Sequence, residues 1–287
     1  MAMTDRDKDL IVVRTVADLR RTVASFRQQG CTIGLIPTMG ALHEGHVSLV
    51  QGALDRGDVP VTSIFVNPTQ FGPNEDFAAY PRDEQGDFDK LTAAGCRIAF
   101  APTKEEMYPG QPLTTVRVIG ITDGLCGPLR PGHFEGVATV VSKLMLMAMP
   151  DRAYFGEKDY QQLQVIKRMV HDLAMPFEIV GMPTVREADG LAMSSRNRYM
   201  SPEERTKAVA LYRELNNVAK AVRAGTSATE ATGAATKALL AAGFDTVEYL
   251  TVTDPDTLAP LERVTGPARV IAATRLGRTR LIDNIAA

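Results

Sequence analysis

Short apolar segments alternate with amphipathic segments over the first two thirds of the chain. Apolar or β-branched runs at 31–36, 59–66 and 97–101 predict strands, and helical spacing at 47–56 and 83–94 predicts helices. Such alternation is typical of βαβ units, in which helices join parallel strands. The pattern therefore favours a doubly wound α/β domain.

Further elements continue this alternation. Thr15, with Asp18 three residues later, predicts the capped start of a helix that ends at Gly30. The other predicted elements are strands at 114–119, 153–155 and 177–182 and helices at 137–149 and 160–174.

The composition and pattern of the sequence change after Thr184, where a charged, glycine-bearing segment precedes two Ala-rich helical stretches. A shift of this kind indicates a domain boundary. We therefore predict an α/β domain over 1–184 and a smaller α+β domain over 185–287.

The second domain shows its own start and stop signals. Ser201 with Glu204, and Ser227 with Glu230, are capping boxes that predict two helices. Three strand-like runs follow, two of them joined at Gly277, which predicts a hairpin. The expected result is a small antiparallel sheet that carries helices.

The composition is that of an ordinary compact protein. Its 287 residues are 45% hydrophobic and 23% charged, which excludes disordered, collagen-like and coiled-coil classes. Thirty-two basic and 34 acidic residues give a net charge of −2, so we expect no nucleic acid or membrane partner. An anionic ligand must therefore be bound by a local cluster.

Cysteine content and the N-terminus favour a cytoplasmic protein. Cys31, Cys96 and Cys126 are odd in number and widely spaced, so the sequence predicts neither a disulfide framework nor a zinc ribbon. The first residues alternate charges and lack the basic and apolar stretches of a signal peptide. The apolar run at 137–149 is shorter than the roughly 18 to 20 residues of a membrane span.

The densest chemical signal is PTMGALHEGH at residues 37–46, between a predicted strand and a helix start. Ligands of open α/β sheets bind outside the carboxyl ends of strands. A helix beginning here would turn His43 and His46 to one side and offer main-chain N–H groups to an anion, while Gly45 leaves room for a flat ring or a phosphate. The alternatives are polar caps of a turn or, less favoured, a metal pair, which would lack a third ligand nearby.

A second candidate follows the predicted strand at 153–155. Lys158 could meet a phosphate as a point charge, and Gln161, Gln162 and Gln164 could bind a hydroxyl or a carboxylate. The alternatives are a solvated lysine and an exposed helix face. The fingerprints G-x-G-x-x-G and G-x-x-x-x-G-K-[ST] are missing from the sequence, which disfavours dehydrogenases and P-loop kinases.

Two loops offer hydroxyl and guanidinium groups. The run Met-Ser-Ser-Arg at 193–196 suits triphosphate oxygens, although such a run is also common on flexible surfaces. Arg130 and His133 offer a further anion contact, with a plain turn as the alternative.

The segment after the strand at 59–66 has the features of a binding site with a cover. Asn67 and Gln70 come directly after the strand. The following segment to Pro81 carries Gly and Pro hinges, which are typical of a lid that keeps water from a reactive intermediate.

These segments together resemble the pantothenate synthetase (pantoate–β-alanine ligase) family over about residues 12–286. A His-x-Gly-His motif alone would indicate only the wider nucleotidyltransferase superfamily, but the combination is specific to the one family. The matching segments, in chain order, are PTMGALHEGH, FVNPTQF, AYPRD, GEKDYQQ, TVREADGLAMSSRNRY and RLIDNIA.

The resemblance implies a Rossmann-like N-terminal domain that binds nucleotide and pantoate, a smaller C-terminal domain that covers the ATP site, and a homodimer. It also implies a two-step reaction. ATP and (R)-pantoate give pantoyl adenylate and pyrophosphate, and β-alanine then displaces AMP to give pantothenate. In-line attack on the α-phosphorus needs positioning and charge stabilisation, with no protein nucleophile.

Individual roles also follow from the resemblance. His43, His46 and Lys158 would be the catalytic residues that contact phosphate oxygens, with His46 in the position of the proton donor. Gln70 and Gln162 would bind pantoate, and Gln70 would also lie where β-alanine enters. The lid at 72–81 would protect the acyl adenylate.

The nucleotide site carries over residue by residue. Ser194, Ser195 and Arg196 would grip the β- and γ-phosphates together with Mg²⁺, and Asp87 is the acid assigned to the metal. The residues expected to line ATP are Met39, Gly40, Ala41, Leu42, His43, Glu44, Gly45, His46, Gly156, Glu157, Lys158, Asp159, Val185, Met193, Ser194, Ser195 and Arg196.

Three other functions fit the sequence less well than this ligase. A cytidylyl- or adenylyltransferase would need a second anion site for a substrate phosphate, whereas the glutamine pair better suits a hydroxy acid. A non-catalytic nucleotide sensor would not need the two histidines, the lysine and the Met-Ser-Ser-Arg run in one chain. A tRNA synthetase is disfavoured by the charge of −2 and by the roughly 100 residues left for an anticodon-reading domain.

Overall fold

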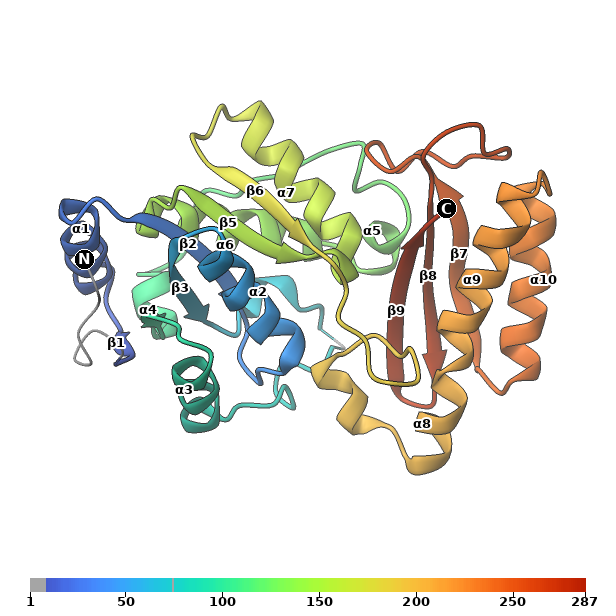
Figure 1. Cartoon of the computed structure of the whole chain (residues 1–287), viewed down its shortest axis with the longest axis horizontal. Coiled ribbons are helices and arrows are strands. Elements are labelled where there is room, and N and C mark those ends of the chain that lie inside the picture. Colours follow the sequence, from blue (N-terminus) through green and yellow to red (C-terminus); the bar gives the residue numbers. More distant parts are fainter. Residues whose placement is uncertain (1–8, 74) are drawn as a thin grey trace. The chain divides into compact units, whose positions relative to one another are not determined.

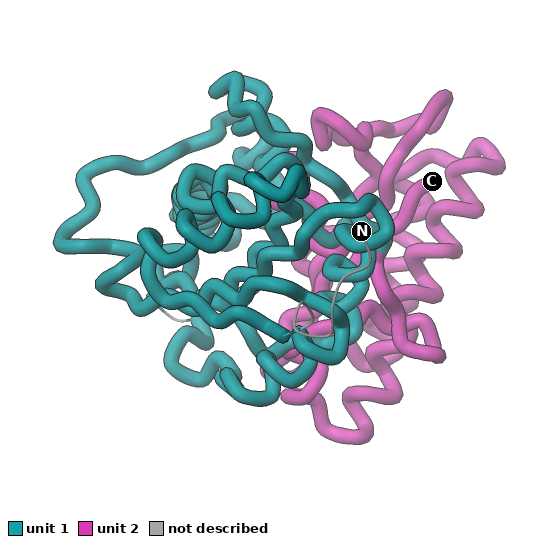
Figure 2. The backbone as a smooth tube through the Cα atoms, turned by 60° about the vertical axis from the view of Figure 1, so that its left-hand side comes forward, with its two compact units in different colours: residues 1–157, 165–183 teal, residues 158–164, 184–287 magenta. Residues whose placement is uncertain are grey.

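The computed structural model describes residues 9–73 and 75–287 (Figure 1). The chain forms two compact units, one of residues 1–157 and 165–183 and the other of residues 158–164 and 184–287 (Figure 2). The second unit begins one residue before the boundary expected from the sequence and also includes the short segment 158–164.

Contacts within the second unit explain why that segment belongs to it. The side-chain amide of Asn284 donates to the main-chain carbonyl of Lys158 at 2.9 Å. The Arg269 guanidinium lies 3.9 Å from the centroid of the Tyr160 ring. The local sequence around Lys158 does not predict these partners, which are more than 100 residues away.

The first unit is built on a six-stranded parallel sheet, which confirms the expected α/β class. Its strands, in spatial order, are β1 (Ile11–Val13), β4 (Ile98–Phe100), β3 (Asp58–Ile64), β2 (Thr32–Thr38), β5 (Arg152–Gly156) and β6 (Glu178–Met182). The central strands are buried, since Leu35, Val61 and Ala153 are at most 1% exposed. Apolar runs of this kind are typical of parallel strands covered on both faces.

Helices cover both faces. The connections between parallel strands are right-handed crossovers. They place the two helices that follow β2 and β3 on one face of the sheet. The three helices that precede β2, β5 and β6 lie on the other face. On the first face Val50 and Leu91 join one apolar cluster, and on the second Ser142 donates to the Met169 sulfur. The helices of these two layers are α2 (Glu44–Asp55) and α3 (Glu84–Ala93), then α1 (Val16–Gln28), α6 (His133–Ala148) and α7 (Tyr160–Asp172).

The expected strand at 114–119 is wrong. This segment belongs to no strand, because its Val116 N–H donates to the Thr139 hydroxyl of α6 instead of to a neighbouring strand. Conversely, β1 was not expected, because it has only three residues and two of them are exposed. The remaining short helices of this region are α4 (Lys104–Met107), α5 (Cys126–Leu129), η2 (Pro68–Gln70) and η3 (Glu157–Asp159).

The second unit is the expected antiparallel sheet with helices. Its strands pair in the order β7 (Thr246–Thr253), β8 (Arg269–Leu276) and β9 (Thr279–Ala286), with Gly277 at φ 55° in the β8–β9 turn. Leu215, Leu239 and Val270 are among the buried side chains that join α9 (Ala210–Arg223) and α10 (Ala228–Ala241) to this sheet.

The first of the two predicted helices is divided. The Ser201–Glu204 capping box is present and starts α8 (Pro202–Ala208), but the helix is interrupted at Val209 before α9 begins. The N–H of Arg213 reaches the Val209 carbonyl only at 3.4 Å, so the first turn of α9 is loosely bonded. Across the described residues, no helix is both long enough and apolar enough to span a membrane.

Candidate functional site

The order of strands directs attention to the carboxyl ends of β2 and β5. These strands are neighbours, and the connections that leave them run to opposite sides of the sheet. A switch point of this kind is where open α/β sheets bind ligands. The loop 39–43 follows β2 directly and η3 follows β5 directly, so two of the segments singled out in the sequence begin at this switch point.

The two histidines form the start of α2. His43 is the N-cap, and its Nδ1 accepts from the Gly45 N–H at 3.1 Å. The His46 Nδ1 accepts in turn from the His43 N–H at 3.3 Å, which completes a capping box made of two imidazoles. The ring centroids are 4.1 Å apart, so the two rings lie on the same side of the helix start, and both also act as the polar caps named as an alternative.

This arrangement sets the position of each ring proton. A main-chain N–H can only donate, so Nδ1 of His43 and of His46 must be the unprotonated nitrogen in the neutral ring. The proton of each neutral ring is therefore on Nε2. Two Nε2–H donors and the N–H groups of a helix start are well suited to phosphate oxygens.

Asp87 of α3 holds the loop that precedes these histidines. Its carboxylate oxygens accept from the N–H of Ala41 at 2.9 Å and of Leu42 at 2.7 Å. Ala41 has a φ of 52°, a conformation that costs free energy for a residue with a Cβ and needs such support. A Cβ on Gly40 would lie 2.9 Å from the Asp87 Oδ2, so this close approach requires glycine.

Asp87 is 1% exposed, which bears on its expected role as a metal ligand. Burial raises the pKa of its carboxyl, and the N–H bonds from Leu42 and Ala41 oppose that rise. Both oxygens thus serve the loop in this structure. Among the described residues no group of three His, Cys, Asp or Glu side chains is arranged to hold a metal ion.

Gln70 lies beside the loop at the end of η2. Its Nε2 is 3.1 Å from the Met39 sulfur, and its Oε1 accepts from Asn67 Nδ2 at 3.1 Å. The Tyr108 hydroxyl donates to Asn67 Oδ1 at 2.9 Å, and burial raises the pKa of that hydroxyl. The structure therefore places the Gln70 carboxamide beside Met39 and fixes it through Asn67.

The remaining predicted residues of β5, η3 and the first turn of α7 are divided between the two units. Gly156 and Glu157 belong to the first unit, whereas Lys158, Asp159 and Gln162 belong to the second. The Lys158 ammonium is 19% exposed and lies 3.7 Å from the Asp159 carboxylate.

The loop 184–200 of the second unit brings the other predicted residues together. The Met193 N–H donates to the Val185 carbonyl at 3.0 Å, and Ser194 caps η4 (Ser195–Tyr199) by accepting from the Arg196 N–H. The Met-Ser-Ser-Arg run thus leads into a short helix, on a loop closed by the bond between Met193 and Val185.

Sequence analysis missed the side chains that hold this loop. Arg186 donates to both Asp283 oxygens at 2.7 and 2.8 Å, and its guanidinium lies 3.8 Å from the Tyr212 ring centroid. Asp283 and Asn284 belong to the terminal RLIDNIA segment, which was noticed only as a family motif. Their function in the structure is to fix Arg186 and the Lys158 carbonyl.

Comparison with known proteins gives one consistent result. A family model described as pantoate-beta-alanine ligase matches residues 11–286. The chain is 57% identical over 274 residues to a pantothenate synthetase of Paramagnetospirillum magneticum, covering 96% of both proteins, and 52% identical to that of Moorella thermoacetica, covering 96% of this chain and 97% of the relative.

Solved structures agree with these relatives. The crystal structure of a pantothenate synthetase from Thermus thermophilus matches with a TM-score of 0.91 and 50% identity, covering 96% of this chain and 98% of the other. A pantoate-beta-alanine ligase from Francisella tularensis, complexed with beta-gamma ATP and beta-alanine, matches with a TM-score of 0.81 and 33% identity, covering 96% and 97%.

Proposed function

Because the chain belongs to the pantoate–β-alanine ligase family, we propose that it joins (R)-pantoate to β-alanine at the expense of ATP. The observation that carries this proposal is the paired imidazole cap at the start of α2, at the switch point of the sheet. The products are pantothenate, AMP and pyrophosphate. A ligand-bound relative, described as complexed with beta-gamma ATP and beta-alanine, supports these substrates.

The reaction has two steps with balanced bonds. A pantoate carboxylate oxygen attacks the α-phosphorus of ATP, and the bond from that phosphorus to pyrophosphate breaks. The β-alanine amine then attacks the acyl carbon, the bond to AMP breaks and the amine loses a proton. Neither step needs a covalent bond to the protein, so the task of the side chains is positioning and charge stabilisation.

We assign the catalytic roles to His46, His43 and Lys158. The Nε2–H groups of the two imidazoles donate to phosphate oxygens, with His46 as the proton donor, and the Lys158 ammonium adds a point charge. Gln70 and Gln162 bind pantoate, and Gln70 also contacts β-alanine. The segment 72–81 acts as the lid; Asn74 within it lies outside the described residues.

We also carry over the residues assigned to ATP. They are 39–46, Gly156, Glu157, Lys158, Asp159, Val185 and the Met-Ser-Ser-Arg run at 193–196. The nucleotide and pantoate are assigned to the α/β domain.

Mg²⁺ enters with ATP as part of the substrate. Magnesium usually keeps several waters and rides on phosphates, which fits a chain whose described residues form no cage for it. We therefore assign Asp87 to holding the loop 39–43. It affects magnesium binding only through the position of that loop.

We also propose a homodimer in the cytoplasm. Leu113 precedes the segment 114–119, which is not part of the sheet, and Ile119 ends it; their exposed fractions are 91% and 73%. A second copy that covers this segment would remove them from water. The three cysteines are unpaired, as in a reducing compartment. Light scattering of L113D should show a monomer where the unmodified chain shows a dimer.

The test of the activity is pyrophosphate–ATP exchange without β-alanine. Exchange that requires pantoate and Mg²⁺ is expected, because the adenylate forms reversibly before the amine arrives. Pantothenate formation without any such exchange would replace the two-step mechanism by a concerted one. If neither exchange nor pantothenate appears, the chain has the fold of the family without its activity.

A further inference from the structure

His133, at the first position of α6, connects two segments that the mechanism above leaves separate. Its Nδ1 lies 2.8 Å from the main-chain oxygen of Gln70, and its Nε2 lies 2.9 Å from an Arg130 nitrogen. The side chain is buried, with an exposed fraction of 8%. The imidazole is therefore a bridge between Arg130 and the backbone of a residue proposed to bind pantoate.

The chemistry of its two neighbours fixes the proton of this ring. A guanidinium has donors and no acceptor, and a carbonyl oxygen can only accept. Nε2 of His133 must therefore carry the lone pair, and Nδ1 must carry the proton that is donated to the Gln70 carbonyl. This is the opposite tautomer to that of His43 and His46, whose Nδ1 atoms accept.

Arg130 can impose this tautomer because it is itself held in place. Its Nε and a terminal nitrogen donate to the two oxygens of Glu75 at 2.6 and 2.5 Å, a bidentate pair. Both side chains are largely buried, with exposed fractions of 16% and 24%. Glu75 also closes a turn onto the Gly72 carbonyl, within the segment assigned as the lid.

The backbone of Gln70 is confined on its other side as well. A Cβ on Gly136, one helical turn after His133, would lie 2.7 Å from the Gln70 Cα and would collide with the Thr69 carbonyl. Asn67 donates from one amide to both the Gly136 carbonyl and the Gln70 Oε1. Because the carboxamide of Gln70 is placed by these few contacts, a shift of its main chain moves the group that would meet pantoate.

We propose that His133 is a positioning residue for pantoate, which acts by donating from Nδ1 to the Gln70 carbonyl, with its tautomer set by the Glu75–Arg130 ion pair. The inference rests on the proposed function, in which Gln70 binds pantoate. It also connects the lid to the substrate site, because the carboxylate that holds Arg130 is part of the lid segment.

Exchange kinetics of matched His133 variants test the proposal. H133A should raise KM for pantoate about tenfold, the effect of losing one ordinary hydrogen bond, and should leave KM for ATP within about twofold. H133N places an amide N–H near the position of Nδ1 and should restore most of the affinity for pantoate. H133Q places its amide near Nε2 and should not.

E75Q and E135Q form a second matched pair. E75Q breaks the buried ion pair with Arg130 and should raise KM for pantoate in the same direction as H133A. Glu135, on the same helix as His133, pairs with Arg117, but this ion pair is exposed, with side chains 43% and 68% exposed. E135Q should therefore leave both KM values unchanged.

The tautomer can be observed without any activity measurement. His171, whose Nδ1 lies 3.1 Å from the Asp172 carboxylate, also carries a proton on Nδ1, so the spectra are best recorded in an H171A background. ¹⁵N spectra of the remaining histidine rings should show one ring protonated at Nδ1, and that signal should vanish when H133N is added. A His133 ring protonated at Nε2 would overturn the proposal even if H133A failed to fold.

The kinetic outcomes separate this inference from the proposed function. If the unmodified chain shows pantoate-dependent exchange but H133N is as impaired as H133A, or KM for ATP rises equally, the positioning role is overturned and the ligase remains. If the unmodified chain shows neither exchange nor pantothenate, both are overturned.

Discussion

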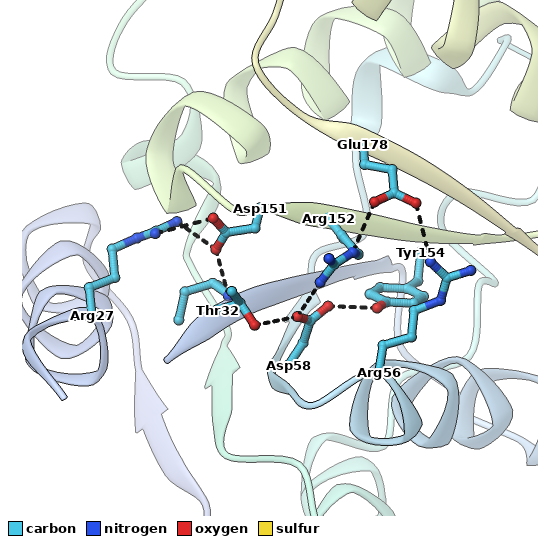
Figure 3. A network of polar contacts seen from close by, with 9 residues as sticks. Arg27, Thr32, Arg56, Asp58, Asp151, Arg152, Tyr154 and Glu178 are labelled. Carbon is cyan, nitrogen blue, oxygen red and sulfur yellow. Dashed lines mark hydrogen bonds and ion pairs between the residues drawn. The ribbon is translucent and has the colours of Figure 1, made fainter. Parts of the chain in front are cut away.

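The two ends of the parallel strands use their polar groups differently. At the amino-terminal ends of the strands, here called the amino edge, a buried carboxylate is hydrogen-bonded to neighbouring side chains. At the carboxyl-terminal ends, the carboxyl edge, polar groups are arranged around a helix start. Asp58, at the first position of β3, accepts from the Thr32 hydroxyl at 2.6 Å, from Arg152 at 2.7 Å and from the Tyr154 hydroxyl at 2.6 Å (Figure 3). Glu178 pairs with the same arginine and with Arg56.

The amino-edge network joins the first residues of four strands. Strands β2, β3, β5 and β6 begin with Thr32, Asp58, Arg152 and Glu178 respectively. The Asp151 carboxylate also accepts from the Ile33 N–H. Such a closed set of bonds fixes neighbouring strands in register.

The carboxyl edge uses its hydrogen bonds differently. His43, His46 and Asp87 satisfy main-chain N–H groups of the loop 39–45, and the imidazoles retain their protons on Nε2. The same sheet thus separates stability from chemistry: substitutions at the amino edge should change unfolding, and those at the carboxyl edge should change turnover.

The largest expected effect is on stability, in D58A. Removing this carboxylate leaves the Tyr154 hydroxyl and the Arg152 guanidinium without their shared partner, at a cost of about 3–5 kcal/mol in the free energy of unfolding. Denaturant unfolding measures this loss, and D55N, at an exposed acid of α2, is the control. Activity of the folded fraction should be unchanged; a loss of turnover without a loss of stability would contradict the separation of the two edges.

H46A should have the next largest effect, on catalysis. Losing a donor to transition-state charge typically lowers kcat by about 10²–10³-fold, with a smaller change in KM. H46Q, whose amide nitrogen lies near the position of Nε2, should recover part of the rate. H171A is the matched control, because His171 is 81% exposed on α7. Loss of binding with unchanged kcat would remove His46 from the transition state.

Much of the scaffold of both edges follows from local sequence. The alternation of strands and helices, the Thr15 and Ser227 caps and the Gly277 turn are all present. They are predictable because each depends on residues within a few positions of one another. The segment 114–119 shows the limit of such predictions. Its β-branched residues fit a strand, but within the part of the chain that the structure describes no strand pairs with it, and its Val116 N–H donates to Thr139.

The partners of the buried charges were not predictable from local patterns. Asp58 meets Arg152 and Tyr154 across more than 90 residues, and Asn284 meets the Lys158 carbonyl across 126. The spacing of His43 and His46 did predict a shared side at a helix start. Which ring nitrogen carries the proton depends on main-chain geometry, for which the sequence has no signal.

D87N tests whether the buried acid at the carboxyl edge acts on the loop 39–43 or on the metal. An amide in place of the carboxylate turns an N–H donor towards one of the Ala41 and Leu42 N–H groups, so the loop that leads to His43 should shift. We expect kcat/KM to fall by about tenfold. D89N, at an exposed acid on the same helix, should have no effect. An unchanged kcat/KM at saturating Mg²⁺, with loss only at low Mg²⁺, would assign Asp87 to the metal instead of to the loop.

Y154F should give the smallest effect, and its pH dependence makes it informative. At neutral pH the lost bond to Asp58 should cost about 1 kcal/mol, because Asp58 retains two other donors. Burial, together with the hydrogen bond to Asp58 and the charge of that acid, raises the pKa of Tyr154 well above its ordinary value. The folded protein therefore keeps this proton at a pH where the unfolded chain loses it, so the stability contributed by Tyr154 is complete below about pH 10 and declines above it. The free energies of unfolding of the unmodified protein and of Y154F should converge as the pH rises from about 8 to about 11. A constant difference over that range would mean that Tyr154 has the same pKa in the folded and the unfolded state. Its hydroxyl would then be less buried, and less firmly bonded to Asp58, than the bonds at the amino edge indicate.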